Sequence, residues 1–387
     1  MFFKYKKYIK SFFMSSNLIE IYYSISSIFL ILIVTLPPFR SLSSISASLK
    51  GYYYVNYSDL GFIKRGLIGS IFKILHITDN FTPSLLVLYS HLFFSILFSI
   101  SFWIFTRSCF RDWKLKEKIS FYTLFALSPV LFLRLGYDIG RMDLICLVLS
   151  LFTIILTLSN YYSFTNKCIF IAISISIQLL IHEASLFFYS PLIIGLLFYK
   201  YPNIRYKKLS KILPIFSLPL ITGFLLLVFG RYEPGREELG IYLTNISKEL
   251  ETSMNVELIH TLKDSFEHSI ILLTPKSLLG GSYLITVYYC FILYLVFKFL
   301  KLPFYLKLSI FSPLILSFIA RDDTRFLAAS TICCNLLMLI SAKESKLDFP
   351  KFFGLLTYIF LITIFLLGPW GIGSYDPLPL LKHYNFN

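Results

Sequence analysis

Charged residues interrupt an otherwise apolar sequence at only a few places, and several of these combine an acid with a neighbouring cation. The first is the stretch from Tyr57 to Gly69, YSDLGFIKRGLIG, which carries Asp59, Lys64 and Arg65 together with three glycines. A carboxylate can take the proton from an attacking hydroxyl. Lysine and arginine side chains bind phosphate. These residue types therefore indicate transfer chemistry on a phosphate-bearing substrate.

A second charged group lies further along the chain, in the sequence DIGRMD from Asp138 to Asp143. Asp138 and Arg141 are three residues apart, a spacing that favours a local ion pair. Gly140 beside Arg141 leaves room for a bulky anionic ligand. We therefore interpret Asp138 as a local partner and Arg141 as a candidate ligand for phosphate.

Two further groups complete the set. His182 and Glu183 stand between two apolar runs, where burial raises the pKa of a carboxyl unless a cation lies close. Glu183 is therefore a candidate acid or base, or else a structural partner of an external arginine. The sequence RDDTR from Arg321 to Arg325 has adjacent acids, which alone do not indicate Mg²⁺. We expect no metal at the site.

Several kinds of chemistry are excluded by missing motifs. The chain has no G-x-x-x-x-G-K-[ST] phosphate loop, no G-x-G-x-x-G, no G-x-S-x-G and no H-E-x-x-H. Its six cysteines include no C-x-x-C pair and have no nearby histidines, which argues against zinc and a disulfide framework. We expect neither nucleotide-driven work nor a cofactor.

The composition places these groups in a membrane protein. Of 387 residues, 56% are hydrophobic and 15% are charged, and the mean hydropathy is +0.72. We expect an all-α, polytopic bundle that forms a single transmembrane domain over 1–387, without a cleaved signal peptide. Runs of suitable length predict eleven spans near 19–38, 84–106, 119–136, 144–160, 168–181, 184–199, 212–230, 282–299, 303–320, 326–342 and 352–369.

Lysine and arginine predict the orientation. With the N-terminus in the cytoplasm, the inner segments hold 21 Lys and Arg against five acids, and the outer segments hold 15 against 16. This distribution obeys the positive-inside rule. The net charge of +15 is thus a topology signal, and its spread over six inner segments argues against a nucleic-acid partner.

This topology places every mixed-charge group on the external face. The first external loop covers 39–83, and a second large loop covers 231–281. Between Gly61 and His76, Ile63, Leu67, Ile71 and Leu75 share one side of a helix, which predicts a helix lying in the membrane interface. Asp59 precedes that helix and Arg65 falls in its first turns. The loop at 231–281 is a mobile lid or a solvated connection.

The length, the Phe-, Ile-, Leu- and Tyr-rich spans and the arginine-bearing external loops resemble bacterial O-antigen and capsule repeat-unit polymerases. An acid in the first external loop followed by an interfacial helix, here Asp59 and 61–76, also resembles membrane glycosyltransferases of the C superfamily. In those enzymes such an acid is the expected base, which implies that role for Asp59. The resemblance also implies a bacterial inner membrane with the site facing the periplasm, a polyprenyl-linked oligosaccharide substrate, membrane lipids, and a chain-length regulator or flippase as partners.

The expected activity is polymerisation of lipid-linked repeat units, with Asp59 or Glu183 as the base. The candidate ligands for substrate and phosphate are Lys64, Arg65, Arg141, Arg321, Arg325 and His182. One alternative is transfer of single sugars from a polyprenyl-phosphate donor. Another is a transporter or flippase of lipid-linked oligosaccharides, although transporters place polar groups near the midplane, whereas these charges collect on one side.

Overall fold

The computed structural model describes five stretches of the chain, 47–110, 139–202, 206–250, 283–318 and 323–345, and nine further residues. Those nine are Ile25, Ile45, Trp113, Lys118, Phe121, Tyr122, Phe125, Leu258 and Ile259. The predicted spans at 19–38 and 352–369 and most of 119–136 fall outside the described residues, as do Asp138 and Arg321.

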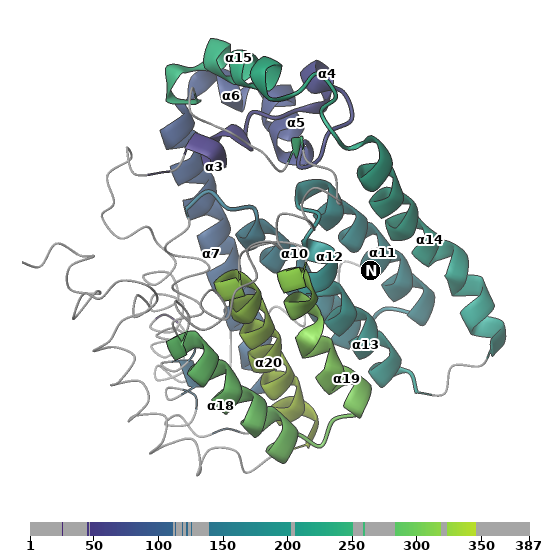
Figure 1. Cartoon of the computed structure of the whole chain (residues 1–387). Coiled ribbons are helices and arrows are strands. Elements are labelled where there is room, and N and C mark those ends of the chain that lie inside the picture. Colours follow the sequence, from purple (N-terminus) through teal and green to yellow (C-terminus); the bar gives the residue numbers. More distant parts are fainter. Residues whose placement is uncertain are drawn as a thin grey trace, which may run out of the picture.

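Every regular element within the described stretches is a helix, so the prediction of an all-helical chain is confirmed for them. Seven helices of eleven or more residues run along the bundle (Figure 1): α7 Pro83–Cys109, α10 Asp143–Leu158, α11 Phe164–Ile181, α13 Ser190–Lys200, α14 Tyr206–Phe229, α18 Tyr283–Phe299 and α20 Asp323–Ser345. Shorter pieces join them: α12 Ser185–Phe188, α19 Phe304–Leu308 and the 3-10 helix η5 Ser309–Phe318.

Four segments of these helices are long and apolar enough to cross a membrane: Pro83–Cys109, Phe164–Ile181, Ile212–Phe229 and Arg325–Lys343. Shorter apolar helices cover Asp143–Leu158, Ser190–Lys200 and Phe304–Leu316. These lengths support a helical membrane protein, because a span of about 30 Å of hydrocarbon takes about 20 residues. They do not establish the predicted number of eleven.

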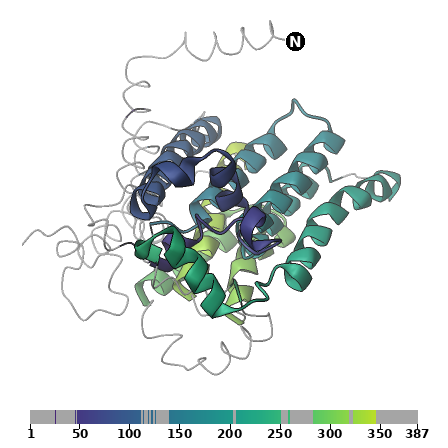
Figure 2. The ribbon, with the colours of Figure 1, turned by 90° about the horizontal axis from the view of Figure 1, so that it is seen from above.

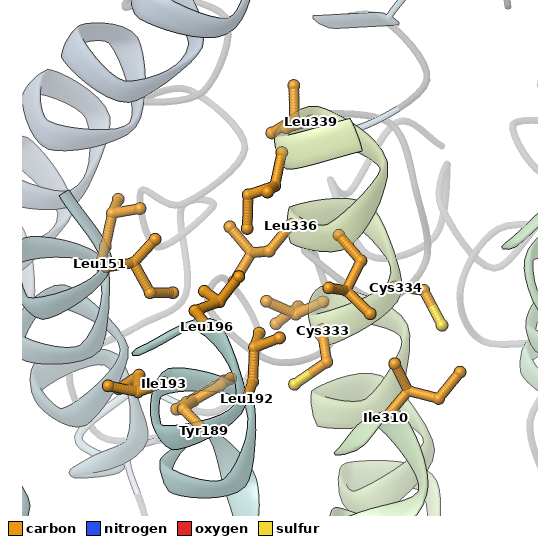
Figure 3. Packing of buried hydrophobic residues seen from close by; sticks show 14 of the residues in the cluster. Leu151, Tyr189, Leu192, Ile193, Leu196, Ile310, Cys333, Cys334, Leu336 and Leu339 are labelled. Atoms are coloured by element: carbon orange, nitrogen blue, oxygen red, sulfur yellow. The ribbon is translucent and has the colours of Figure 1, made fainter. Parts of the chain in front are cut away.

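The core forms around α20, which packs chiefly against η5 and α18 and also contacts α7 and α12. Leu192 and Leu196 of α13 lie opposite Cys333 and Leu336 of α20 (Figure 3), and all four are buried. Apolar side chains gain little from leaving lipid for a helix contact, so close packing is what stabilises such an interface. By contrast α14 contacts chiefly α11, and most of its outer side chains are exposed, as expected for a lipid-facing helix.

One end of the bundle is covered by short helices, and we call it the capped end. The cap consists of α3 Ala47–Gly51, α4 Tyr57–Leu60, α5 Leu67–Ile74, α6 Ile77–Asn80 and α15 Arg236–Ile246, which lie across the long helices (Figures 1 and 2). Leu239 and Leu243 of α15 are buried in the same cluster as Tyr53, Val55 and Ile68. The apolar side of α15 therefore holds the segments around 47–81 and 236–250 together.

A second contact ties α15's segment to the rest of the cap. The carboxylate of Glu249 accepts hydrogen bonds from the backbone N–H of Ser84 at 3.1 Å and from Nζ of Lys50 at 3.3 Å. The hydroxyl of Ser84 donates to the same carboxylate and lowers the pKa of Glu249 most, followed by Lys50 and by the backbone N–H of Ser84, against the opposing effect of burial. The residues joined in this way are about 165 and 199 positions apart in the chain, so the contact fixes the cap as one unit.

The predicted interfacial helix is shorter than expected. It was predicted over 61–76 with Arg65 in its first turns, but α5 begins at Leu67. Gly61 and Arg65 both have positive φ, at 71° and 61°, and such a backbone cannot continue a right-handed helix. Arg65 therefore lies in the turn before α5. The helix ends at Ile74, and α6 follows.

Gly69 explains why a small residue is needed in α5. A Cβ built there would lie 2.0 Å from the carbonyl oxygen of Val55, so α5 crosses the 53–55 backbone at a distance that only glycine permits. Gly240 in α15 offers a matched comparison, because a Cβ there meets nothing within 4 Å.

We predict that Gly69→Ala destabilises the protein by about 1–3 kcal/mol, because the backbones must separate. Gly240→Ala should instead stabilise it by about 0.5–1 kcal/mol, the gain of alanine over glycine in a helix. Thermal unfolding of both variants in the same detergent measures this difference. Equal effects of the two changes would show that the α5 crossing is not tight.

Candidate functional site

Five side chains from four parts of the chain meet beneath the cap. Arg65 comes from the turn before α5, His182 and Glu183 from the connection after α11, Asp143 from the first turn of α10 and Arg325 from the first turn of α20. We call this group the ion-pair cluster. It joins the turn before α5 to three helices of the bundle.

Arg65 and Glu183 form a two-pronged ion pair. Nε of Arg65 donates to Oε2 of Glu183 at 3.0 Å, and Nη2 donates to Oε1 at 2.5 Å. The guanidinium also lies 4.7 Å from the ring centre of Tyr52, within the range of a cation–π contact. The positive φ of Arg65 turns its side chain down from the cap, and only 8% of that side chain is exposed. The pair therefore holds the loop against α11.

Arg325 forms the second ion pair of the cluster. Its Nε and Nη2 donate to Oδ2 and Oδ1 of Asp143 at 2.9 and 2.7 Å. The same Nη2 lies 2.5 Å from Nε2 of His182. The carboxylate of Asp143 is 1% exposed, and its place at the N-terminus of α10 favours a negative charge. This contact therefore fixes the positions of α10 and α20 relative to each other.

His182 is neutral in this arrangement. Burial, followed by the charges of Arg65 and Arg325, lowers the pKa of His182 to about 3. Its two ring nitrogens face donors, the backbone N–H of Ala184 at 3.1 Å and the guanidinium of Arg325. A neutral imidazole carries one N–H, so one nitrogen accepts and the other keeps its proton. A second proton would place a positive charge against the arginines. The charges of the cluster therefore balance, with two arginines against two carboxylates.

Glu183 is ionised although it lies against the bundle. Burial alone raises the pKa of a carboxyl, but the charge and the hydrogen bonds of Arg65 outweigh it and hold the pKa of Glu183 well below its ordinary value. Its side chain is still 35% exposed. Of the alternatives that the sequence left open, the contacts match a structural partner of an external arginine.

Asp59 lies in a separate group within the cap, with Asn56, Lys73 and Tyr242. Lys73 forms an ion pair with Oδ1 of Asp59. The other oxygen, Oδ2, accepts from Nδ2 of Asn56 at 3.0 Å and from the hydroxyl of Tyr242 at 2.8 Å. Asn56 also caps α4 and accepts from the backbone N–H of Asp59 at 3.0 Å. We call these four residues the Asp59 group.

The partners of Asp59 keep it charged. The hydrogen bond from Lys73 has the largest effect, followed by those from Asn56 and Tyr242, and together they lower the pKa of Asp59 to about 2 against the opposing effect of burial. About a third of the side chain, 32%, is exposed. The result is an ionised carboxylate that solvent and small molecules can reach.

The residues predicted from the sequence thus divide into two groups. Arg65, His182, Glu183 and Arg325 meet in the ion-pair cluster, whereas Asp59 lies with other partners. Lys64 is half-buried, and its backbone N–H donates to the carbonyl of Gly230 at 2.9 Å, next to the end of α14. Arg141 is half-buried beside Gly140, which has a positive φ of 95°.

Two important residues were missed. Asp143 belonged to the predicted Asp138–Asp143 group but was given no role, although its position after a run of loop residues and before an apolar helix is a typical signal. Lys73 lies 14 positions from Asp59, and no local spacing rule links two residues so far apart. Among the described residues, no group of three His, Cys, Asp or Glu is placed to hold a metal ion.

No protein-family model matches the chain, and neither does any curated protein or solved structure. The bundle and the two groups of polar side chains at its capped end are therefore the basis of the functional proposal.

We predict that Asp143→Ala destabilises the protein by about 3–5 kcal/mol, because it leaves Arg325 charged and without its carboxylate. The double variant Asp143→Leu, Arg325→Leu should cost less than Asp143→Ala, since no charge is left behind. Unfolding in detergent compares the two, with Asp79→Ala as the control because that carboxylate is 67% exposed. A loss for Asp143→Ala no larger than for the control would contradict the role of the pair.

The Asp59 group predicts a pH dependence. The pKa of Asp59 falls from its ordinary value of 3.8 to about 2 in the folded protein, so its contribution to stability is complete above pH 3.8 and is lost as the pH falls toward 2. Wild type should therefore exceed Asp59→Asn in stability at neutral pH. The difference should shrink between pH 3.8 and 2, which melting curves across that range would measure. A difference in stability between wild type and Asp59→Asn that does not change with pH would contradict the lowered pKa of Asp59.

Proposed function

We propose that this chain is a membrane glycosyltransferase that moves a sugar from a polyprenyl-linked donor to an acceptor hydroxyl at the capped end. The observation that carries the proposal is Asp59, an ionised and partly exposed carboxylate held by three donors at the end of an apolar helical bundle. In this proposal, a donor anchored in the bilayer presents its sugar and phosphate at the capped end of the bundle.

Asp59 is the proposed base. A general base must be ionised and accessible to the proton that it takes. The Asp59 carboxylate is ionised, and 32% of its side chain is exposed. The low pKa makes it a weak base while Lys73 is bound. Separation of Lys73 from the carboxylate raises the pKa of Asp59 and increases its ability to accept a proton.

Glu183 is proposed to position the cap rather than to react. Both of its oxygens accept hydrogen bonds from Arg65, and Arg65 is held in turn by Tyr52. To take a proton, Glu183 would have to give up this pair and leave a buried guanidinium uncompensated. Arg325 is likewise proposed to have a positioning role, because releasing Asp143 to bind a ligand would leave a buried carboxylate uncompensated.

The proposed step is a single displacement at the anomeric carbon. The acceptor oxygen forms a bond to that carbon, and its proton passes to Asp59. The bond from the anomeric carbon to the phosphate oxygen breaks, and its electron pair leaves with the phosphate or pyrophosphate. Lys64 and Arg141, which the sequence indicated as phosphate ligands, are the cations proposed to stabilise this charge.

The most specific form of the proposal is polymerisation of O-antigen or capsule repeat units at the periplasmic face of a bacterial inner membrane. A chain-length regulator and a flippase are the partners that such a pathway requires. Transfer of single sugars uses the same chemistry. Transport is less well supported, because the ionic side chains that meet among the described residues lie at one end of the bundle and not at its midplane.

The test is to delete the gene in its native host and to analyse the surface glycan by gel electrophoresis. Strains restored with wild type, Asp59→Asn or the control Asp79→Asn are compared at equal protein level. We expect deletion to collapse the ladder to a single-repeat band. We expect Asp79→Asn to restore the ladder and Asp59→Asn to fail, because loss of a general base lowers turnover by about 10²–10⁴-fold.

Other outcomes separate the alternatives. A full ladder with one sugar missing indicates transfer of single sugars. An unchanged glycan after deletion contradicts the proposal and favours transport or another substrate. If Asp59→Asn restores the full ladder, the transferase proposal stands but Asp59 is not its base.

A further inference from the structure

The outer side of α5 and α6 carries an apolar surface next to the Asp59 group. Ile71, Ile74, Leu75 and Phe81 are exposed there, by 40%, 76%, 60% and 40%. The opposite side of α5 is buried, with Ile68 and Gly69 against the cap. We call these four exposed residues the α5 patch.

The α5 patch continues into the exposed side of α7. The ring of Phe81 meets the ring of Tyr89 edge to face, with centres 5.5 Å apart. Beyond Tyr89, the exposed residues Phe93, Ile96 and Ile100 follow at helical spacing along α7. Because α7 is long and apolar enough to span a membrane, its exposed apolar side faces lipid. Continuity with that side indicates that the α5 patch faces lipid as well.

Lys73 lies on the other side of α5 from the α5 patch, one helical turn after Gly69. Its side chain is 41% exposed, and its ammonium holds Asp59. An amphipathic helix in the interface places its cations at the level of the lipid phosphates. A lipid phosphate and the Asp59 carboxylate thus compete for one ammonium group.

We propose that α5 and α6 lie in the headgroup layer with the α5 patch among the acyl chains, and that Lys73 exchanges Asp59 for the phosphate of an anionic lipid. The exchange is a change of ion-pair partner with no bond made or broken. It does not depend on glycosyl transfer. If Asp59 is the base, lipid binding frees it from the cation that weakens it.

The position of the helix is tested with spin labels on the full chain in vesicles. A Cys290→Ser background removes the exposed native thiol, since the other five cysteines are buried. Labels are placed at Ile74→Cys and, as a control, at Asp79→Cys on α6. We expect oxygen to reach the first label and a water-soluble nickel chelate the second. Equal access of the chelate to both would overturn the proposal.

The exchange is tested by adding phosphatidylglycerol to phosphatidylcholine vesicles and following the mobility of the Ile74 label. We expect Lys73→Gln to raise the fraction of phosphatidylglycerol needed for half of the response by about fivefold, while Lys73→Arg leaves it near wild type. Asp59→Asn removes the competitor and should lower that fraction by a similar factor.

A double variant decides whether the two residues compete. If they do, Asp59→Asn has no effect once Lys73 is Gln, because the shared ammonium is gone. An effect of Asp59→Asn that persists in the Lys73→Gln background overturns the exchange, and so does a response that Lys73→Gln leaves unchanged. Native mass spectrometry of retained phosphatidylglycerol provides an independent readout of the same variants.

Discussion

The arrangement at the capped end depends on the cost of placing charge against an apolar bundle. A buried ion without a partner costs several kcal/mol, whereas a well-placed pair with hydrogen bonds compensates much of that cost. Arg325 and Asp143 meet this condition with two bonds below 3 Å. Their contact is possible in only one register of α20 against α10. The pair therefore adds a directional ionic contact to a core made largely of apolar side chains.

The same constraint connects the cap to the bundle. Arg65, in the turn before α5, binds Glu183, which is next to His182, and His182 contacts Arg325. A displacement of the loop thus disturbs the contact between α10 and α20. The segment that contains α15 also contacts this part of the chain, through the bond from Tyr242 to Asp59 and the bond from Ser84 to Glu249. Ionic contacts thus join the cap to the bundle, and apolar side chains pack within the cap.

Two carboxylates of similar exposure have different surroundings, and the difference assigns their roles. Glu183 is paired with an arginine that is itself buried and stacked on Tyr52. Asp59 is paired with a lysine of the amphipathic helix α5, and 41% of that lysine side chain is exposed. An exposed ammonium changes partners at little cost, whereas a buried guanidinium does not. Asp59 is for this reason the carboxylate that a ligand can reach and release.

The sequence by itself determined the class of fold and the end of the bundle where charges collect. Long apolar runs with few charges require helices, because a backbone in lipid must satisfy its own hydrogen bonds. Span boundaries such as those of α7 and α11 followed from composition, and the helix of the first loop followed from its periodicity. Its start was misplaced, because the positive φ at Arg65 depends on the contact with Glu183 and not on local preference.

Only the tertiary structure decided which charges are partners. Glu183 pairs with Arg65, Asp143 with Arg325, and Asp59 with Lys73. The first two of these pairs join residues that are 118 and 182 positions apart in the chain. Ionic attraction is similar for any acid and any base at a given distance. The sequence lists the charges, but the packing of the helices sets the distances between them, and so distinguishes a structural carboxylate from one that is available for chemistry.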